Sequence, residues 1–304
     1  MNLRTEILTI LYKLFPFSLK GDIELSSTDA DCELSCIINF YGRVSLLEGV
    51  LYSLAEQDLS KKRFEVILVE DRGGTELGRN TAKKFSNKLN IKYFAIKEYY
   101  GRMGYSRNIG ALESRGRIML FLDDDTIMLQ NNFLAVLIDE FERSGENAIV
   151  PRGMASFSLL KGRYGFHEPY FPTNRCIAYS RDALKELGGF VSDIIGQEDV
   201  EFVIRFIASG KRFYNSNRLC YFHPPLMLNN LNKAIAVGIS FAKLKKRYPF
   251  FVWLLLVMNG LRFLPLVVFP FNIKWRTQGK FSMGFFIGAL YAIIGKEASY
   301  GQNG

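Results

Sequence analysis

Residues 117–125 read Arg-Ile-Met-Leu-Phe-Leu-Asp-Asp-Asp, an apolar run that ends in three consecutive acids. A short continuous apolar stretch is typical of a strand buried on both faces of a parallel sheet. Carboxylates held this close raise one another's pKa unless a cation neutralises them. Asp123 and Asp125 can both approach one divalent ion, and oxygen ligands suit Mg²⁺ or Mn²⁺. The alternative is a solvated acidic turn in which an Asp caps a helix.

Strands and helices alternate on both sides of this stretch. We expect strands at 33–40, 64–69, 91–96 and 117–122, and helices at 46–54, 106–114, 131–143, 180–187 and 199–208. Strands joined by helices of this length predict an α/β fold with a doubly wound, mostly parallel sheet flanked by helices. Such a sheet binds its ligands outside the carboxyl ends of its strands. Residues 152–175 have no clear period and are expected to form a long loop or an irregular antiparallel patch.

The charge of the chain is concentrated near its end. The 304 residues include 39 Lys and Arg against 30 Asp and Glu, a formal net charge of +9. Residues 226–304 contain ten basic residues and one acid, so the whole excess lies in the last quarter. A basic, aromatic and apolar tail favours an anionic membrane surface as partner. It argues against nucleic acid, because the aromatics lie in apolar runs rather than between basic residues.

Two apolar stretches of the tail, 250–271 and 281–295, bear on how it would meet a membrane. The first is long enough to span a bilayer but contains Arg262, Pro265 and Pro270, and the second is short. Broken helices that lie in the membrane interface therefore fit better than a spanning hairpin. The alternatives are a helical subdomain packed on the sheet or an oligomer contact.

The N-terminal residues have apolar side chains at helical spacing up to Pro16, which predicts an amphipathic helix. This helix either packs on its own domain or contacts a membrane.

We thus divide the chain into an N-terminal helix and linker (1–31), an α/β domain (32–225) and a basic, apolar helical region (226–304). The four cysteines form no CxxC pair and no cleaved signal peptide is evident, so a reducing compartment is expected.

Further polar groups follow the predicted strands or open predicted helices. Glu70 and Asp71 come directly after the second strand, where a base or ribose is bound in such folds, or they are turn acids before two glycines. Arg107 and Asn108 lie at a helix start, which suits phosphate, although a cap and a surface arginine would look the same.

Two acids and a histidine in the last part of the α/β domain are also candidates. Glu198 and Asp199 open a helix, where a carboxylate could deprotonate an acceptor hydroxyl or simply interact with the helix dipole. His223 is one of only two histidines. A lone histidine is more often structural, but a neutral imidazole can complete a metal shell.

The order of these motifs is more informative than any one of them. Over residues 33–225 the chain resembles inverting family 2 glycosyltransferases of the GT-A fold. The matching segments are Cys-Ile-Ile-Asn-Phe-Tyr (36–41), Val-Glu-Asp (69–71), Ser-Arg-Asn-Ile-Gly (106–110), Leu-Asp-Asp-Asp (122–125), Gly-Gly-Phe (188–190) and Gly-Gln-Glu-Asp (196–199). Two segments depart from the family pattern: 39–42 reads Asn-Phe-Tyr-Gly instead of Pro-Thr-Tyr-Asn, and 70–73 reads Glu-Asp-Arg-Gly instead of Asp-Asp-Gly-Ser.

The resemblance implies roles for these residues. Asp199, with Glu198 beside it, would supply the catalytic base, and the metal would be held by Asp123, Asp125 and His223. The residues expected to bind the nucleotide-sugar are Asn39, Tyr41, Glu70, Asp71, Arg107, Asn108, Asp123 and Asp124.

The resulting functional prediction is an inverting glycosyltransferase that moves a sugar from a nucleotide-sugar, expected to be a UDP-sugar, to a hydroxyl of a glycan or lipid-linked acceptor. It would use Mg²⁺ or Mn²⁺ and work peripherally at the cytoplasmic face of the cell membrane in polysaccharide biosynthesis. One alternative is a nucleotidyltransferase, for which Gly-Arg-Val-Ser at 42–45 is a poor phosphate loop. Another is a catalytically silent membrane-associated scaffold. The presence of acids at all three acidic motifs argues against this alternative. The sequence leaves the oligomeric state open.

Overall fold

The computed structural model describes residues 3–26, 32–156, 163–165, 174–223, 231–268 and 273–296. These residues belong to two compact units. The larger unit comprises residues 20–192 and 199–225, and the smaller unit comprises residues 1–19, 193–198 and 226–304.

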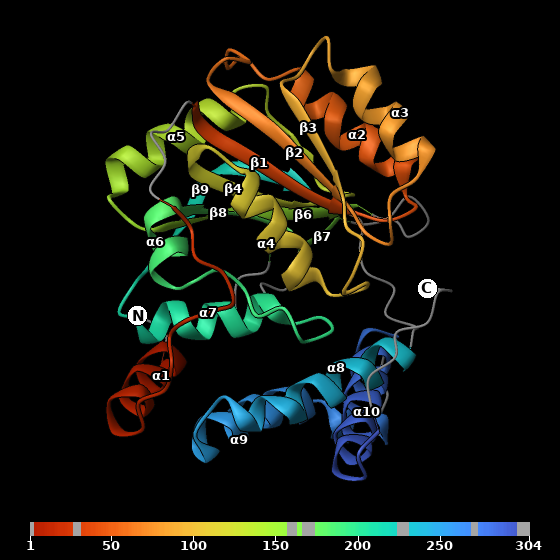
Figure 1. The fold of residues 1–304 in the computed structure, drawn as a ribbon. Helices are drawn as coiled ribbons and strands as arrows, with labels where there is room; N and C mark the ends of the chain where they lie inside the picture. Colours follow the sequence, from red (N-terminus) through yellow and green to blue (C-terminus); the bar gives the residue numbers. More distant parts are fainter. Residues whose placement is uncertain are drawn as a thin grey trace. The chain divides into compact units, whose positions relative to one another are not determined.

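The first half of the sheet in the larger unit is parallel (Figure 1). Its strands are β1 (Cys32–Phe40), β2 (Phe64–Glu70), β3 (Ile91–Ala95) and β4 (Gly116–Asp123), in the order β3-β2-β1-β4. These are the four strands that the apolar runs predict, each within one or two residues. Every residue of β2 is buried, which explains the unbroken apolar run Val66–Val69 at its centre.

The second half of the sheet is mixed. Its described strands are β5 (Ile127–Met128), β6 (Ala148–Ser156), β7 (Arg163–Gly165), β8 (Cys176–Ser180) and β9 (Phe213–Phe222). The order beyond β4 is β8-β6-β9-β5, and β7 pairs with β6. Strand β8 runs antiparallel to β4 and to β6, whereas β9 runs parallel to β6 and antiparallel to β5. The predicted α/β sheet is therefore confirmed as a mixed sheet, of which only the half β3-β2-β1-β4 is entirely parallel.

Helices cover both faces of the sheet (Figure 1). On one face lie α2 (Val44–Ala55), α3 (Glu76–Phe85) and α5 (Phe133–Ser144), and on the other lie α4 (Met103–Glu113), α6 (Arg181–Glu186) and α7 (Glu198–Ala208). Helix α3 was not predicted, because its residues are mostly polar and only a few of them, such as Phe85, reach the core.

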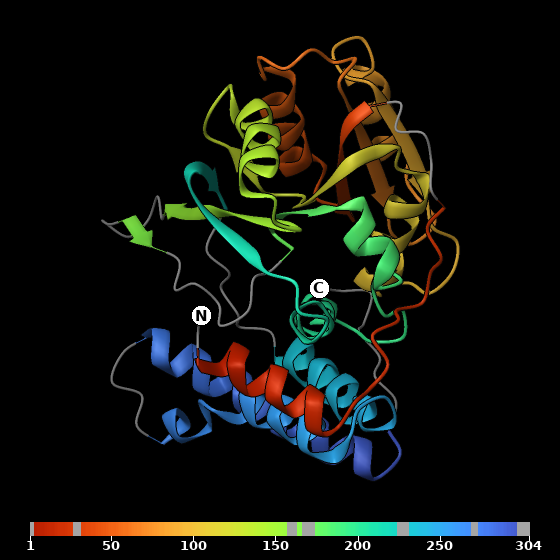
Figure 2. The ribbon, with the colours of Figure 1, turned by 90° about the vertical axis from the view of Figure 1, so that its left-hand side faces the viewer.

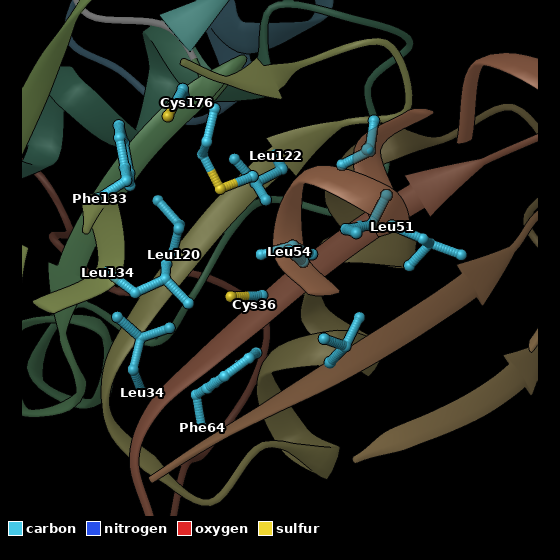
Figure 3. Close-up of a cluster of buried hydrophobic side chains, with 14 of the residues drawn as sticks. Leu34, Cys36, Leu51, Leu54, Phe64, Leu120, Leu122, Phe133, Leu134 and Cys176 are labelled. Atoms are coloured by element: carbon cyan, nitrogen blue, oxygen red, sulfur yellow. The ribbon is translucent and has the colours of Figure 1, made fainter. Parts of the chain in front are cut away.

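The main core lies between the sheet and helices α2, α3 and α5 (Figure 3). Alternate residues of β1, such as Leu34 and Cys36, meet Leu120 of β4 and Leu54 of α2 there. Ile37 faces the opposite side of the sheet, where α4 passes very close. A Cβ atom on Gly110 of α4 would lie 2.4 Å from Cγ2 of Ile37, so only glycine permits this approach. The close packing fixes α4 over the carboxyl half of β1.

The smaller unit is helical (Figure 2, red and blue). It contains α1 (Leu3–Leu14), α8 (Leu231–Lys243), α9 (Phe250–Leu261) and α10 (Ile273–Ile293), together with the 3₁₀ turns η1 (Leu244–Lys246) and η2 (Leu264–Val267). The described part of the first predicted apolar stretch contains α9 and η2, and the second stretch overlaps the last part of α10. Helix α1 ends two residues before Pro16, close to the predicted stop.

Candidate active site

The carboxyl ends of the parallel strands bring several predicted residues to one edge of the sheet. In the register of β1 and β4, Asn39 lies opposite Asp123, and in that of β1 and β2, Phe40 lies opposite Glu70. Asn39 is buried, and its amide nitrogen donates a hydrogen bond to Oγ of Ser106, the residue before Arg107 on α4. Its carbonyl oxygen is buried without a hydrogen-bond partner among the described residues.

Asp123, Asp125 and His223 form a candidate metal site. One ligand atom from each can be chosen so that all three lie within 4.8 Å of one another. Nε2 of His223 lies 3.0 Å from Oδ1 of Asp125 and 3.6 Å from Oδ2 of Asp123. The histidine reaches the acids because β5 pairs with β9 in a register that places Ile127 opposite Phe222. Two carboxylates and an imidazole are a reasonable ligand set for a divalent cation such as Mn²⁺.

The acids and the histidine perturb one another's ionisation. Burial would lower the pKa of His223, but hydrogen bonds to Asp123 and Asp125, together with their negative charges, raise it to about 9. Burial works against ionisation of both carboxyls, yet contact with His223 keeps the pKa of each below its usual range. The cluster therefore balances its negative charge with an imidazolium, and a cation bound there would take over that role.

Asp124 faces a different partner, Arg43. This arginine is the N-cap residue of α2 and binds Asp124 through Nε, at 3.2 Å, and through Nη2. Its Nη1 atom lies 2.9 Å from Oδ2 of Asp125. Burial raises the pKa of Asp124 to about 7; the charges of Asp125 and Asp123 add to the shift, and Arg43 opposes it. Arg43 was not predicted as a site residue, because its contact with the acids depends on the turn between β1 and α2, which has no local signature in the sequence.

Arg107 contacts Asp123, one of the same acids. Its side chain is buried, and Nη2 is 3.3 Å from Oδ1 of Asp123. Because α4 packs closely on β1, the guanidinium is carried to the end of β4 next to the predicted metal ligands. The structure thus brings together Asn39, Arg107, Asp123, Asp124, Asp125 and His223.

Glu70 holds the turn that follows β2. Its carboxylate accepts hydrogen bonds from the N–H of Thr75 at 2.9 Å, from Oγ1 of Thr75 at 2.7 Å and from the hydroxyl of Tyr93 at 2.5 Å. Thr75 in turn caps α3 by accepting a hydrogen bond from the N–H of Gly78. These contacts give Glu70 a structural role, and its predicted contact with the nucleotide base stays a prediction.

Asp71 and Tyr41 are connected through Arg72. The carboxylate of Asp71 accepts hydrogen bonds of 2.8 Å from the N–H groups of Arg72 and Gly101. The guanidinium of Arg72 lies over the ring of Tyr41, 4.7 Å from its centroid. The Tyr41 ring is exposed, so an aromatic surface is available beside Asp71.

Asn108 is buried in a framework contact. Its amide exchanges two hydrogen bonds with the main chain of Phe190 and donates a third to Oγ of Ser192. The turn that contains Phe190 is also held from α7, because the buried Arg205 donates hydrogen bonds to the carbonyls of Leu187 and Gly189. This geometry ties α4 and α7 to one turn, and the predicted contact of Asn108 with the donor stays a prediction.

The two predicted catalytic acids lie at the start of α7. Glu198 is almost fully buried, whereas Asp199 is half-buried and accepts a hydrogen bond from the N–H of Val200. The pKa of Tyr179 on β8 is affected by the charges of both Asp199 and Arg107. Burial raises the pKa of this phenol well above its ordinary value, Asp199 adds to the shift, and Arg107 opposes it. Asp199 and Arg107 therefore both act on the same buried side chain.

An open α/β sheet with acids, arginines and a histidine at the carboxyl ends of its parallel strands defines a ligand-binding domain of the GT-A type. Residues 35–176 match the family model described as glycosyl transferase family 2. The predicted family and fold are confirmed.

Two curated relatives share sequence with part of the chain. Poly(ribitol-phosphate) beta-N-acetylglucosaminyltransferase TarS of Staphylococcus aureus is 32% identical over 110 residues, which cover 36% of this chain and 19% of TarS. Validoxylamine A glucosyltransferase of Streptomyces hygroscopicus is 34% identical over 90 residues, 30% of this chain and 21% of the relative. The chain thus spans about a fifth of the length of the curated relatives it matches.

Solved structures share the fold over more of the chain. The mannosyltransferase PcManGT from Pyrobaculum calidifontis, solved with GDP-Man and Mn²⁺, has a TM-score of 0.64 and 14% identity, with 97% of each chain covered. Residues 1–349 of S. aureus TarS, solved with UDP-GlcNAc, have a TM-score of 0.57 and 18% identity, with 84% of this chain and 81% of that one covered.

Proposed function

We propose that this protein is an inverting glycosyltransferase that transfers a sugar from a nucleotide-sugar to a hydroxyl group. The observation that carries the proposal is the meeting of Asp123, Asp125 and His223 at the carboxyl ends of the parallel strands, with Arg107 beside them. Metal ligands and a guanidinium at this edge of an α/β sheet suit a nucleoside diphosphate. The match of residues 35–176 to the family 2 model supports sugar transfer as the reaction.

We assign the metal site to Asp123, Asp125 and His223. The imidazole favours Mn²⁺ over Mg²⁺, which binds almost only oxygen ligands. When bound, the ion would neutralise charge on the leaving diphosphate. The Mn²⁺ in the solved PcManGT complex supports this choice of metal.

The other residues of this edge would bind and orient the donor. Arg107 adds a positive charge next to Asp123, and Arg43 binds both Asp124 and Asp125. Asn39, with its unpartnered buried oxygen, and the exposed ring of Tyr41 beside Asp71 would contact the nucleoside. Uridine is the proposed nucleoside, in keeping with the UDP-GlcNAc bound by the TarS fragment.

Asp199 is the proposed catalytic base. It takes the proton of the acceptor hydroxyl as that oxygen bonds to the anomeric carbon and the nucleoside diphosphate leaves. A single displacement of this kind inverts the anomeric configuration. We assign the base to Asp199 rather than Glu198, because the almost fully buried Glu198 side chain is poorly placed to meet an acceptor.

The proposed acceptor is a glycan or a lipid-linked glycan at the cytoplasmic face of the cell membrane. The basic excess of residues 226–304 supports this location, since the cytoplasmic leaflet carries anionic lipids. The homologous stretch in TarS supports a role in polysaccharide biosynthesis.

A panel of UDP- and GDP-sugars tests the activity. With Mn²⁺ present, the matching donor should raise the melting temperature and release nucleoside diphosphate slowly by transfer to water. The variant Asp125→Ala should lose both effects, whereas Glu48→Ala, at an exposed ion pair on α2, should retain them. A panel in which no donor stabilises the protein or is cleaved would overturn the proposal.

A further inference from the structure

We propose that the smaller unit is a membrane-docking module built from both ends of the chain, which inserts apolar faces of α1, α9 and α10 into one leaflet of an anionic lipid bilayer. The inference deepens the proposed function by naming the surface through which the enzyme reaches the membrane. It depends on residues of a different unit from those that form the candidate active site.

The outer faces of α1 and α10 are apolar. On α1, Ile7, Ile10 and Leu14 are exposed and share one side of the helix, being three and seven residues apart, while Leu8 is buried. On α10, the exposed large side chains Phe286, Leu290 and Ile293 recur with the same period and form a second stripe, and the exposed Ile294 follows directly after the helix. Large apolar residues that face outward in stripes indicate a surface that meets an apolar environment.

The inner faces of α8 and α10 are made of small residues. A Cβ atom on Gly238 of α8 would lie 2.1 Å from the carbonyl oxygen of Phe285 on α10. A Cβ atom on Gly288 of α10 would lie 2.1 Å from the carbonyl oxygen of Ile235 on α8. The two backbones are therefore in direct contact. Small residues inside and large apolar residues outside are the arrangement of helices that associate within lipid.

The segment that includes α9 is unlike the core helix of a water-soluble domain. Residues Phe250–Val267 have a mean hydropathy of 1.9, yet only 11% of this stretch is buried. Phe251 and Met258, one heptad apart, are both exposed on α9. A helix this apolar with so little burial requires another apolar partner.

Helix α1 belongs to the same surface. The ring of Phe15 lies 5.1 Å from that of Phe251, and the ring of Phe17 lies 4.9 Å from that of Tyr248, which is buried. These contacts join the N-terminal segment to the start of α9 (Figure 2). The apolar stripe of α1 is thereby attached to the tail rather than left as an isolated amphipathic helix.

Charge favours anionic lipid over a second copy of this chain. The described acids of the smaller unit are Glu6, Asp193 and Glu198. The exposed basic residues of this unit are more numerous and include Lys13, Lys243, Lys245, Lys246, Arg262, Arg276, Lys280 and Lys296. Each basic residue near an anionic surface contributes roughly 1 kcal/mol of attraction, whereas two copies of a basic surface repel each other.

The lengths of the apolar helices favour one leaflet. At 1.5 Å per residue, the 12 residues of α1 and of α9 are each about 18 Å long, against a hydrocarbon core of about 30 Å. With η2, the stretch Phe250–Val267 has 18 residues and is long and apolar enough to cross a membrane, but it contains Arg262 and Pro265, which oppose a straight span. Helix α10 has 21 residues, but its first two turns contain Lys274, Arg276 and Lys280. The apolar remainder of α10 is too short to span the bilayer.

Tryptophan fluorescence of the full-length protein tests the proposal directly. The only two tryptophans, Trp253 and Trp275, both lie in the smaller unit. Vesicles of phosphatidylglycerol and phosphatidylcholine should shift the emission to the blue and carry the protein upward in flotation. Lipids brominated near the head group should quench more than lipids brominated near the chain end. Equal quenching by the two brominated lipids would contradict insertion into a single leaflet.

Paired variants identify the surface. Leu14→Glu on α1 and Ile293→Glu on α10 should each weaken vesicle binding about tenfold or more, because a carboxylate opposes insertion and the apolar burial is lost. Leu77→Glu, at an exposed leucine of α3, should leave binding unchanged. Donor binding by all three variants should equal that of the wild type. The membrane-docking proposal fails if Leu14→Glu and Ile293→Glu bind vesicles like the wild type, or if the protein forms a dimer that does not bind vesicles. Either result would leave the proposed sugar transfer unaffected.

Discussion

The side-chain amide of Asn108 exchanges two hydrogen bonds, each of 2.8 Å, with the main-chain N–H and C=O of Phe190. These bonds join the helix that carries Arg107 to the Gly-Gly-Phe turn, and Arg205 holds the same turn from the helix that carries Asp199. The proposed phosphate-binding arginine and the proposed base are thus attached to one short segment. Asn108 and Arg205 are positioning residues for both.

We expect Asn108→Ala to lower the free energy of unfolding by about 1–3 kcal/mol, because two buried main-chain groups of Phe190 lose their partners. Urea unfolding followed by circular dichroism measures the change. The matched control is Asn87→Ala, at an exposed asparagine, which should change stability by less than about 0.5 kcal/mol. Equal effects of the two substitutions would contradict the framework role.

Glu65 gives a pH-dependent contribution to stability. It is buried at the end of the sheet opposite to the candidate site. Burial opposes its ionisation, but hydrogen bonds from Lys92, Ser35 and the N–H of Arg115 lower its pKa below the ordinary value. A carboxyl whose pKa is depressed in the folded state stabilises the fold above its unfolded pKa of about 4.3, and this stabilisation is lost as the pH falls through the folded pKa.

Glu65→Gln should therefore be less stable than the wild type at neutral pH by about 1–3 kcal/mol. The difference between the two proteins should shrink steadily below about pH 4. Urea unfolding of both proteins across this pH range measures the difference. A gap that stays constant from neutral pH into the acid range is the result that rules out an ionised, depressed Glu65.

Arg43 competes with a metal ion for the acids. Its guanidinium binds Asp124 and lies 2.9 Å from Oδ2 of Asp125, a proposed metal ligand. Removal of this charge in Arg43→Gln should tighten Mn²⁺ binding to the donor-free protein by about three- to tenfold, a modest effect because the side chain is half exposed and screened. Isothermal titration with MnCl₂ measures the affinity. Arg63→Gln, at an exposed pair with Glu33, is the control, and weaker Mn²⁺ binding by Arg43→Gln would show that Arg43 supports the metal site instead.

The parallel half of the sheet could be predicted from the sequence because its strands are buried on both faces. Runs such as Val66–Val69 are continuous and apolar, which is typical of a short strand buried on both faces. The antiparallel strands are different. In β9 (Phe213–Phe222) exposed and buried positions follow no strict alternation, so the period-2 signal is absent. Tertiary pairing rather than local pattern fixes these strands.

The same distinction applies to the candidate site. Asp123 and Asp125 are two residues apart in the sequence and follow a recognisable strand, so their association was predictable. His223 could be named only by its residue type and by the family resemblance, because β5–β9 pairing across almost a hundred residues brings it to the acids. The contact of Arg43 with Asp124 depends on the turn between β1 and α2, for which the sequence has no local signature.

Asp199 provides the sharpest test of the reaction mechanism. Asp199→Asn keeps the shape of the side chain and its hydrogen bond with the N–H of Val200, but it removes the group that accepts a proton. Sugar transfer should fall by at least about 10²-fold, since general base catalysis contributes 10²–10⁴-fold. Binding of Mn²⁺ and nucleotide should stay at the wild-type level, because the donor-binding residues are unaltered.

The measurements are transfer to an acceptor by product analysis and nucleotide affinity by calorimetry, made on the same preparations. Asp193→Asn, at an exposed acid a few residues before α7, is the matched control and should transfer sugar at the wild-type rate. If Asp199→Asn transfers sugar as fast as Asp193→Asn, the base lies elsewhere. If it loses nucleotide binding as well, Asp199 acts on the donor rather than on the acceptor hydroxyl.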